Sequence, residues 1–287
     1  MRFIWWDFAG IGLVLLSWTL LLVGMIVTHD FVMVAWFADR EYGGDWKLST
    51  TGTWLWRVYR LIAFLTVASQ VRAMLADPGI MRGVTSEKAK RKCEKCTAWK
   101  PARAHHCSIC GDCIFRMDHH CPWVNNCVGY GNLKFFILYT GYSTLLSCYT
   151  LVLLGVGSVL WWRLGLPVNT IAAVAGVTVA LEATFLCWFA GDFFAEQLEA
   201  IETNTTLVET YKDTQGANIR TTTFFQRFVD IFGEHALLWP LPIATTRQPP
   251  DYFEGVLKEF NKQPLISVSS GKGLAEVADE PEKVKLS

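Results

Sequence analysis

Apolar residues in this chain are gathered into long uninterrupted runs instead of recurring at the period of a surface helix or strand. The segment Phe8–Val27 carries no charged residue over twenty positions, and Phe135–Trp162 carries none over twenty-eight. A helix needs about 20 apolar residues to cross the hydrocarbon core of a bilayer. Both runs therefore predict membrane-spanning helices.

Two further segments are apolar but interrupted by charge. Trp54–Leu75 is uncharged only in its centre, and its arginines lie nearer the ends, where long side chains can reach the interface. Pro167–Phe194 is apolar apart from Glu182 and Asp192, and an acid inside a span, such as Glu182, is a candidate functional residue. The pattern predicts an all-α polytopic membrane protein with four spans. The first span is expected to be retained, because its apolar run is too long for a cleaved signal peptide.

The loops between these spans differ in their content of Lys and Arg. The loop Thr28–Thr53 holds two such residues and the turn after the third span holds one, whereas Ala76–Lys134 holds ten and the chain after Phe194 holds nine. Cytosolic loops carry the excess of Lys and Arg in membrane proteins. The middle loop and both termini are therefore expected in the cytosol.

Composition agrees with a membrane protein and narrows its partners. The chain is 52% hydrophobic, with 13 Trp and 18 Phe, which exceeds the usual content of a soluble domain. The formal net charge of zero hides the asymmetry between the loops. Since the basic residues lie between spans, they favour the lipid bilayer or an anionic cofactor such as CoA, and no nucleic acid is expected as a partner.

Cysteines are concentrated in the predicted cytosolic loop. Seven of the nine fall between Cys93 and Cys127, while Cys148 and Cys187 fall inside spans and are expected to be small apolar residues. The cytosol keeps thiols reduced, so the clustering indicates metal binding and not disulfides. Cys-x2-Cys pairs with interleaved histidines are typical of tetrahedral zinc. Two Cys3His sites would use six of the seven cysteines, and this arithmetic leaves open which thiol is spare.

The segment Asp118-His119-His120-Cys121 adds a second kind of chemistry. A nucleophilic thiol needs a base that removes its proton, and the base needs a group that orients it. Asp, His and Cys can supply these three roles. From the residues alone, the segment fits equally well as metal ligands beside an unrelated acid.

From Cys93 onward the chain reads C-x2-C-x3-K-P-x-R-x2-H-C-x2-C-x2-C-x4-D-H-H-C-P-W-V-x-N-C-V-G-x2-N. This stretch resembles the cysteine-rich domain of the DHHC protein S-palmitoyltransferases along its whole length. Asp77-Pro78-Gly79, just after the second span, resembles the DPG motif of the same family. The place of the loop, between the second and third of four spans, is similar to the family architecture.

The resemblance implies a reaction and a role for each residue of the loop. It implies transfer of a long-chain fatty acyl group, such as palmitoyl, from acyl-CoA to cysteines of membrane-associated proteins. Cys121 would be the acylated nucleophile, His119 its base and Asp118 the acid that orients the base. One zinc ion would be held by Cys93, Cys96, His106 and Cys113, and a second by Cys107, Cys110, His120 and Cys127.

Substrate contacts are expected around this loop. Trp123 is expected to pack near the thioester, and apolar residues of the third and fourth spans are expected to line an acyl tunnel. Lys100, Arg103 and Arg91 are candidates for binding the phosphates of CoA. The alternative for any single one of these basic residues is that it only reflects cytosolic topology.

The motif after the fourth span departs from the family pattern. The family's Thr-Thr-x-Glu motif after the fourth span corresponds here to Thr205-Thr206-Leu207-Val208-Glu209, which is one residue longer. Either Thr205 or Thr206 is therefore expected to make the contact near Asp118.

These expectations divide the chain into five parts. Residues 1–75 hold spans one and two, residues 76–134 the zinc domain, and residues 135–194 spans three and four. Residues 195–260 are expected to pack on the membrane domain, and residues 261–287 to form a disordered tail. The family resemblance favours the Golgi or the endoplasmic reticulum membrane. The competing hypothesis is a membrane-anchored zinc scaffold without catalytic activity.

Overall fold

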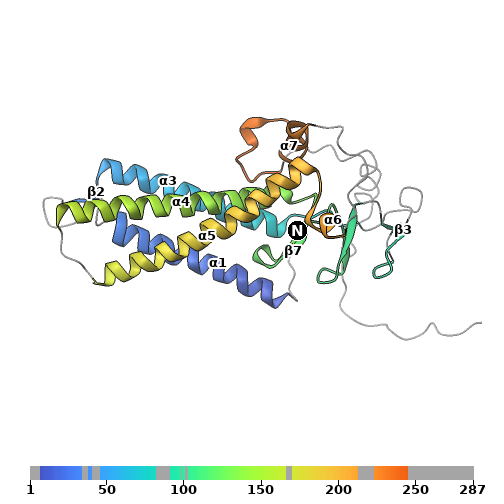
Figure 1. Ribbon diagram of the computed structural model, residues 1–287, viewed down its shortest axis with the longest axis horizontal. Coiled ribbons are helices and arrows are strands. Elements are labelled where there is room, and N and C mark those ends of the chain that lie inside the picture. Colours follow the sequence, from blue (N-terminus) through green and yellow to red (C-terminus); the bar gives the residue numbers. More distant parts are fainter. Residues whose placement is uncertain are drawn as a thin grey trace, which may run out of the picture.

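The computed structural model describes residues 7–33, 38–40, 46–81, 91–97, 99–100, 103–165, 170–212 and 223–244. Within these residues, four helices are long and apolar enough to cross a membrane. They are α1 (Phe8–Val27), α3 (Thr50–Leu75), α4 (Leu133–Leu164) and α5 (Thr170–Thr203). The helices form one elongated bundle (Figure 1), in which α4 packs against both α3 and α5. The predicted four-span helical fold is confirmed.

The fourth helix is longer than its apolar run. Hydropathy predicts an end at Phe194, whereas α5 continues to Thr203 and stops at Asn204, whose positive φ of 53° breaks the helix. The additional turns bury Gln197 and Ile201 and leave most of their other side chains exposed. Hydropathy marks where the bilayer ends, and it carries no information on a helix that continues into water.

The bundle has an apolar outer surface. On α5, Leu181 is 69% exposed and Trp188 is 68% exposed. Apolar patches of this extent are rare on a soluble monomer, and they suit a surface that faces lipid. At one end of the bundle, a π-helical turn (Thr28–Met33) and the antiparallel pair β1 (Ala38–Arg40) and β2 (Trp46–Leu48) connect α1 to α3.

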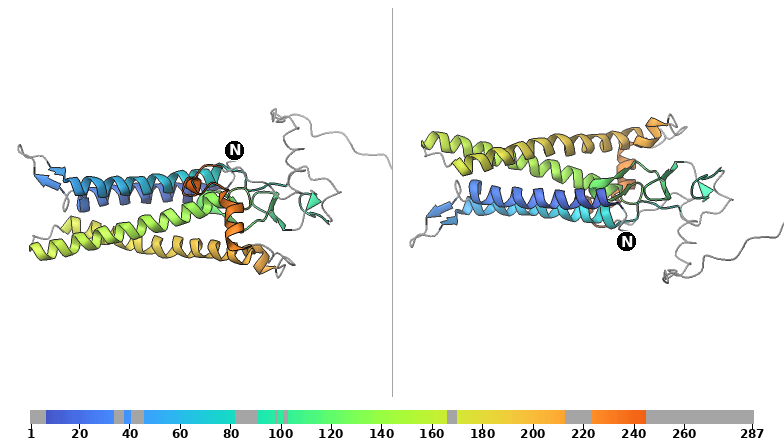
Figure 2. Two further views of the ribbon diagram at one scale, coloured as in Figure 1. Left: turned by 90° about the horizontal axis from the view of Figure 1, so that it is seen from above. Right: turned by 90° about the horizontal axis from the view of Figure 1, so that it is seen from below.

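Three small hairpins lie beyond the opposite end of the bundle (Figure 2). Strand β3 (Arg91–Lys92) pairs with β4 (Trp99–Lys100), β5 (Ala104–Cys107) with β6 (Asp112–Phe115), and β7 (His119–Cys121) with β8 (Asn126–Val128). A short 3-10 helix, η2 (Pro122–Val124), joins the last two strands. Isolated two-stranded sheets are marginally stable at best. These hairpins therefore need support from outside the strands.

A tight turn after α3 provides part of that support. The Asp77 carboxylate accepts hydrogen bonds from the backbone N–H groups of Gly79, at 2.8 Å, and Ile80, at 2.9 Å. Gly79 has a φ of 103°, a conformation that favours glycine. Gly131, just before α4, packs so closely that an added Cβ would lie 2.0 Å from the carbonyl oxygen of Asp77. The turn thus joins the end of α3 to the start of α4.

Two buried asparagines also tie the hairpins to the bundle. The last carbonyl groups of a helix have no partner within the helix. Here the side-chain amide of Asn126 donates to the carbonyl oxygens of Ala73, Met74 and Ala76 at 3.0–3.1 Å. The amide of Asn132 donates to the carbonyl oxygen of Ala73 at 3.0 Å. The C-terminal end of α3 is therefore held by residues of the cysteine-rich loop.

After α5 the chain folds back onto the same end of the bundle. It forms α6 (Leu207–Tyr211), α7 (Phe224–Phe232) and η3 (Ala236–Leu238). Ile231 and Phe232 of α7 pack against Ile137 of α4 and Ile201 of α5. Lys134 Nζ donates to the carbonyl oxygen of Leu238 at 2.9 Å. The tail 261–287, predicted to be disordered, lies outside the described residues.

Candidate functional site

Two groups of metal-ligating side chains are assembled by the hairpins. The first contains Cys93, Cys96, His106 and Cys113, and the second contains Cys107, Cys110, His120 and Cys127. In each group the ligand atoms lie within 4.8 Å of one another. The strand register explains part of this grouping, because His106 is paired with Cys113 across β5 and β6, and His120 with Cys127 across β7 and β8.

The donor atoms have the spacing that tetrahedral zinc requires. His120 Nδ1 lies 3.7 Å from the Sγ atom of Cys107, 3.4 Å from that of Cys110 and 3.6 Å from that of Cys127. Zn–N and Zn–S bonds of 2.0–2.3 Å imply donor separations of about 3.5–3.8 Å in a tetrahedron. In the first group, Sγ of Cys96 and Cys113 are 3.6 Å apart, and the buried Nδ1 of His106 has no hydrogen-bond partner among the described residues. Both groups fit zinc.

Alternation along β7 separates the metal ligand from the candidate catalytic pair. Successive side chains of a strand point to opposite faces. His120 faces the second metal group, so His119 and Cys121 share the other face. Cys121 belongs to neither metal group and is 3% exposed. The spare thiol of the loop therefore lies beside a histidine, and both are held on a strand that is tied to the second metal group.

The second metal group has a carboxylate partner from the first span. His120 Nε2 lies 3.0 Å from Oδ2 of Asp7. The same carboxylate caps α1, because its Oδ1 accepts from the backbone N–H of Gly10 at 3.0 Å. A carboxylate on the second nitrogen fixes the orientation of a metal-ligating histidine and raises its basicity. Asp7 is in position to do both.

His119 is held by an aspartate and surrounded by aromatic rings. Its Nδ1 lies 2.9 Å from Oδ2 of Asp118, and its ring packs edge-on against Phe136, with centroids 5.3 Å apart. Burial disfavours the charged ring, but the Asp118 carboxylate and the Cys121 side chain outweigh burial and raise the pKa of His119 to about 9. Nε2 of His119 is buried and has no hydrogen-bond partner among the described residues. Nε2 is therefore the ring nitrogen that is available to exchange a proton with the Cys121 thiol.

Asp118 in turn is fixed by two donors from the chain after the third span. Gln197 Nε2 donates to Oδ2 at 2.9 Å, and the backbone N–H of Leu207 donates to Oδ1 at 2.8 Å. Burial raises the pKa of the carboxyl, but the bonds from His119, Leu207 and Gln197 outweigh it and lower the pKa. Asp118 is thus an anion that is oriented from several sides.

Among the described residues, neither threonine of the expected Thr-Thr-x-Glu motif makes a hydrogen bond to Asp118. Thr205 donates its hydroxyl to the carbonyl oxygen of Thr203, and Thr206 caps α6 by accepting from the N–H of Glu209. The expectation that one of the two makes this contact is therefore wrong. The extra residue of the motif places the backbone N–H of Leu207 there instead.

Arg103 occupies an internal ion pair. Its guanidinium group donates to both carboxylate oxygens of Glu209, at 2.7 and 2.8 Å, and to the carbonyl oxygen of Asn204 at 2.7 Å. The Glu209 side chain is 2% exposed and that of Arg103 is 14% exposed. The charge of Arg103 is therefore paired within the protein, where it links α6 to the cysteine-rich loop. This position does not fit the expected role of Arg103 in CoA binding.

The other basic candidates lie at the outer hairpin. Lys100 ends β4 and is partly exposed. Arg91 lies in β3, and its side chain is outside the described part of the chain. His105, which the family pattern leaves without a ligand role, is buried near Lys212 and Lys100, and its pKa falls to about 4 through burial and these two charges.

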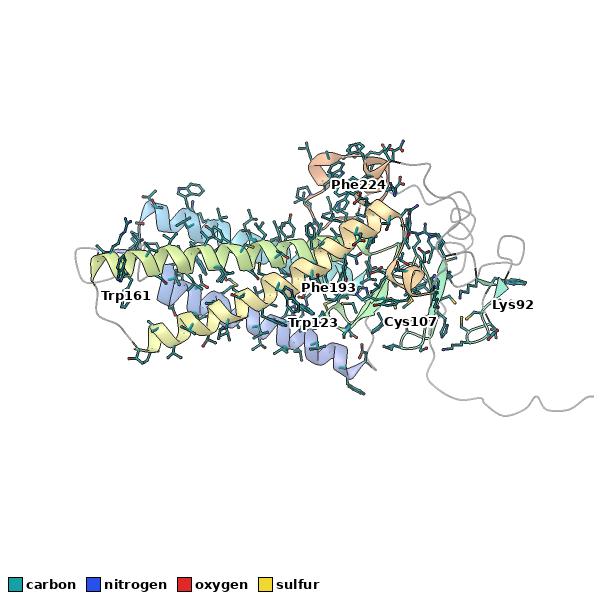
Figure 3. All side chains as sticks on the ribbon, viewed as in Figure 1. Lys92, Cys107, Trp123, Trp161, Phe193 and Phe224 are labelled. Carbon is teal, nitrogen blue, oxygen red and sulfur yellow. The ribbon has the colours of Figure 1, made fainter. Side chains whose placement is uncertain are left out.

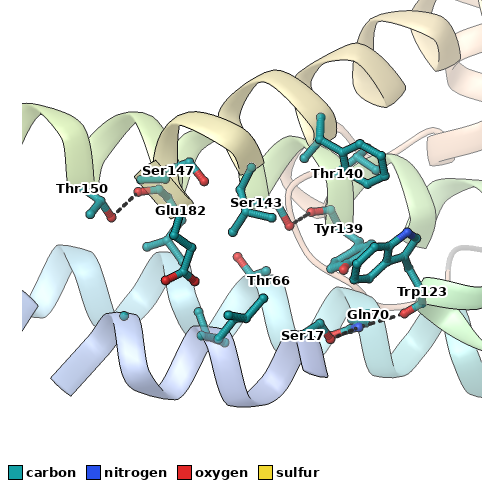
Figure 4. Close-up of a pocket in the computed structure, with 18 of the residues that line it drawn as sticks. Ser17, Thr66, Gln70, Trp123, Tyr139, Thr140, Ser143, Ser147, Thr150 and Glu182 are labelled. Atoms are coloured by element: carbon teal, nitrogen blue, oxygen red, sulfur yellow. Dashed lines mark hydrogen bonds between the residues drawn. The ribbon is translucent and has the colours of Figure 1, made fainter. Parts of the chain in front are cut away.

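Cys121 opens onto a cavity that runs into the helix bundle. Figure 4 shows this cavity between helices of the bundle, with Trp123 at one end and Glu182 toward the other. Phe189 packs edge-on against Trp123, with centroids 5.7 Å apart, and also lines the cavity. Figure 3 places Trp123 and Phe193 where the bundle meets the cysteine-rich loop. The thiol thus lines a largely apolar space within the membrane-spanning part.

The polar residues along the cavity are mostly engaged with the protein. Gln70 of α3 donates to Ser17 Oγ and to the carbonyl oxygen of Trp123, both at 2.9 Å, and accepts from Trp18 Nε1 at 3.0 Å. It therefore links α1, α3 and η2 next to the thiol. Glu182 differs, since no hydrogen bond or ion pair from the described residues reaches its carboxylate, which lies close to Gly24 of α1.

Sequence reasoning missed the partners that lie far away in the chain. Gln197, Asp7 and Gln70 each contact the site through a side chain that no motif marks. Gln197 carried one usable signal, because it is a polar residue that follows the apolar run of the fourth span on the same helix. Asp7 carried another, because it is the acid directly before an apolar run and is suited to cap the helix.

Comparison with known proteins identifies similar chains. The family model "DHHC palmitoyltransferase" matches residues 86–214. The chain is 33% identical over 260 residues to palmitoyltransferase ZDHHC3 of Homo sapiens, an alignment that covers 84% of this chain and 83% of that protein. It is 32% identical to palmitoyltransferase ZDHHC7 of Mus musculus, which covers 85% and 82% of the two chains. Palmitoyltransferase ZDHHC15 of Homo sapiens is 30% identical over 196 residues, 64% of this chain and 56% of that protein.

Proposed function

The chain belongs to the DHHC palmitoyltransferase family, and we propose that it moves a long-chain acyl group from acyl-CoA to protein cysteines through an acyl-enzyme on Cys121. It is a multi-pass membrane protein with protein S-palmitoyltransferase activity. One observation carries the proposal: a buried thiol outside both metal groups lines an apolar cavity, beside a histidine that an aspartate holds.

The chemistry follows from the groups on that face of β7. His119 takes the proton of the Cys121 thiol, and Asp118 orients the ring and stabilises its charge. The thiolate attacks the thioester carbonyl, the bond to the sulfur of CoA breaks, and the departing thiolate receives the proton from His119. A cysteine thiolate of the protein substrate then attacks the acyl-enzyme and releases Cys121. Each step exchanges one thioester for another, so the reaction needs no further energy source.

The cavity supports this reaction because it suits the acyl chain. Each methylene group that leaves water contributes about 0.8 kcal/mol, so a long chain is strongly drawn into an apolar space. A cavity that opens at Cys121 and extends between spanning helices accepts the chain and leaves the anionic head of CoA in water. We assign Trp123 to the region of the thioester and Lys100 and Arg91 to the CoA phosphates.

We assign the two Cys3His groups to structural zinc ions. Each group offers four protein ligands, which matches a closed structural site and leaves no open position for a substrate. When bound, the ions supply rigidity to the hairpins that present Cys121. No step of the proposed reaction passes through them.

Topology and location complete the proposal. The excess of Lys and Arg in the loop 76–134 and after the fourth span supports a cytosolic position for the hairpins and both termini. Acyl-CoA is a water-soluble anion at its head, and this orientation gives it access to Cys121. Membership of the family supports a place in the Golgi or endoplasmic reticulum, where the substrates would be cysteines of membrane-associated proteins.

The experiment that tests the proposal is covalent labelling. The purified protein is incubated with alkyne-tagged palmitoyl-CoA, and label is compared before and after hydroxylamine in the wild type, Cys121→Ser and Cys148→Ser. Cys148 is a control, because it is a free and exposed thiol of α4 outside both metal groups. We expect hydroxylamine-sensitive label in the wild type and the control and none in Cys121→Ser. Zinc-loaded wild type that takes no label would favour the non-catalytic scaffold.

A further inference from the structure

Two arginines lie on the lipid-facing side of α3. Arg57 and Arg60 are exposed, and they are separated by three positions, so they lie one above the other on the helix. Their Cα atoms lie about 10 and 15 Å along the axis from the start of the helix at Thr50, given the rise of 1.5 Å per residue. The whole helix is about 39 Å long, and the hydrocarbon core is about 30 Å thick. The Cα atoms of both arginines therefore lie at the depth of the hydrocarbon core.

The positive charges of this pair are not neutralised by an acid of the described chain. Arg57 lies over the ring of Trp54, with 4.9 Å between the guanidinium carbon and the centroid, and Arg60 makes no hydrogen bond or ion pair with a described residue. Glu182, the acid within the fourth span, faces the cavity of the acyl site instead. A charged side chain in the hydrocarbon region is costly and normally faces a partner or water.

The direction of α3 determines which leaflet these two side chains can reach. Side chains of a helix lean toward its N-terminus. The N-terminus of α3 is the end remote from the metal groups, next to β2 (Figure 1), so both side chains lean toward the head groups of that leaflet. The guanidinium group of Arg57, which is nearer the end of the helix, can be hydrated at the membrane surface. Arg60 lies one turn deeper, so its guanidinium group reaches water less readily.

The groove around the arginines is otherwise apolar. Arg57 and Arg60 line it together with Leu21 and Met25 of α1 and Phe64 and Val67 of α3. Side chains of α1 and α3 line the groove together, and Gln70 of α3 bonds to Ser17 and Trp18 of α1 further along the two helices. Two guanidinium groups above apolar walls are complementary to an amphiphile with a phosphate head and hydrocarbon chains. Guanidinium groups bind phosphate in a bidentate manner, and basic pockets between spanning helices bind anionic lipid head groups.

We propose that Arg57 and Arg60 bind the phosphate of an anionic phospholipid, whose acyl chains lie in the groove between α1 and α3, in the leaflet remote from the metal groups. The lipid supplies the negative charge that the described chain lacks at this depth. The groove shares Leu21 with the cavity at Cys121, but Arg57 and Arg60 do not line that cavity, and the proposal does not depend on acyl transfer.

Native mass spectrometry of the protein from nanodiscs containing equal phosphatidylglycerol and phosphatidylcholine tests the proposal. We expect the wild type to retain phosphatidylglycerol in at least tenfold preference, which corresponds to about 1.4 kcal/mol. The preference should disappear in Arg57→Gln/Arg60→Gln. It should remain in Arg163→Gln, which removes a charge from α4 at the same end of the bundle but outside the groove. Metal content and monodispersity verify the fold of each variant.

Several outcomes would overturn the proposal. Equal retention of the two lipids by the wild type would do so even if the double variant failed to fold. A preference that persists in a folded double variant would place the lipid elsewhere. Displacement of phosphatidylglycerol by an equal concentration of glycerol 3-phosphate would assign the arginines to a free phosphate ester and not to a lipid.

Discussion

Asp7 and His120 are 113 positions apart in the chain, yet 3.0 Å separates their side-chain atoms. The bond joins the start of the first span to the ligand that directly precedes Cys121. A single carboxylate oxygen therefore connects the position of α1 with the orientation of a metal-binding imidazole, and its other oxygen caps the helix. Asp7 acts through His120, so its loss should affect metal binding more directly than it affects the reaction at Cys121.

We expect Asp7→Asn to release zinc to a chelator about 10-fold faster than the wild type, because loss of a carboxylate partner weakens a histidine ligand by one or two orders of magnitude. The measurement is the rate of zinc release, followed with a colorimetric chelator. Asp30→Asn is the matched control, since it removes the same charge just beyond the other end of α1. Equal release rates for Asp7→Asn and the wild type would show that the bond does not support the ligand.

The pair of Arg103 and Glu209 makes a prediction about stability. Removing one partner of a buried ion pair costs about 3–5 kcal/mol, so Glu209→Gln should lower the free energy of unfolding by roughly that amount. Burial raises the pKa of the Glu209 carboxyl, but the bonds from Arg103 and the Thr206 N–H outweigh it and lower the pKa. A carboxyl with a lowered pKa stabilises the fold above its unfolded pKa of about 4.3, and this stabilisation is lost as the pH falls through the folded pKa.

The stability gap between the wild type and Glu209→Gln should therefore be full near neutral pH and shrink on acidification below about pH 4. Thermal unfolding of both proteins over a pH series measures it. A gap that stays constant down to the lowest pH would mean that the glutamate acts through packing and not through its charge.

At the scale of elements, strand β7 shows what the sequence could and could not predict. The motif indicated that His119, His120 and Cys121 carry chemistry, and the family pattern divided them into ligand and catalytic residues. The physical reason for this division is that successive side chains of a strand point to opposite faces. The sequence did not reveal the strand, because a strand of three residues is too short to show an alternating pattern. The four spans were predictable from hydropathy, but the turns of α5 beyond its apolar run, which carry Gln197, were not.

The joint between α3 and α4 gives an element-scale prediction. Gly131→Ala places a Cβ 2.0 Å from the carbonyl oxygen of Asp77, so the backbone of the turn would have to shift. We expect the variant to lose several °C in unfolding temperature, as a destabilisation of about 1–3 kcal/mol implies for overpacking. Gly12→Ala, where the added Cβ meets no atom within 4 Å, should match or exceed the wild type. Similar unfolding temperatures for the two variants would contradict the importance of this contact.

Considered as a whole, the molecule combines two parts that are stabilised differently. The four helices have backbone hydrogen bonds within each helix and an apolar surface suited to lipid, so the bilayer supports them. The hairpins β3 to β8 have strands of two to four residues, and they are held by the two Cys3His groups and the bonds to the end of α3. Cys121 lies where the two parts meet, and it needs the bundle for its cavity and the hairpins for its position.

Metal removal should separate these two parts. Since metal binding supplies folding free energy to small domains that have no sufficient core, a strong zinc chelator should unfold the hairpins and leave the helices intact. Hydrogen–deuterium exchange measured before and after chelation should show protection lost across residues 104–128 and kept in α1, α3, α4 and the membrane part of α5. The contact of Asp118 with Leu207 and the pair of Arg103 with Glu209 would break as well, so α6 should also lose protection. Protection that is lost equally in the spans would mean that the bundle depends on the metal groups, and unchanged protection in the hairpins would mean that the joint to α3 alone suffices to fold them.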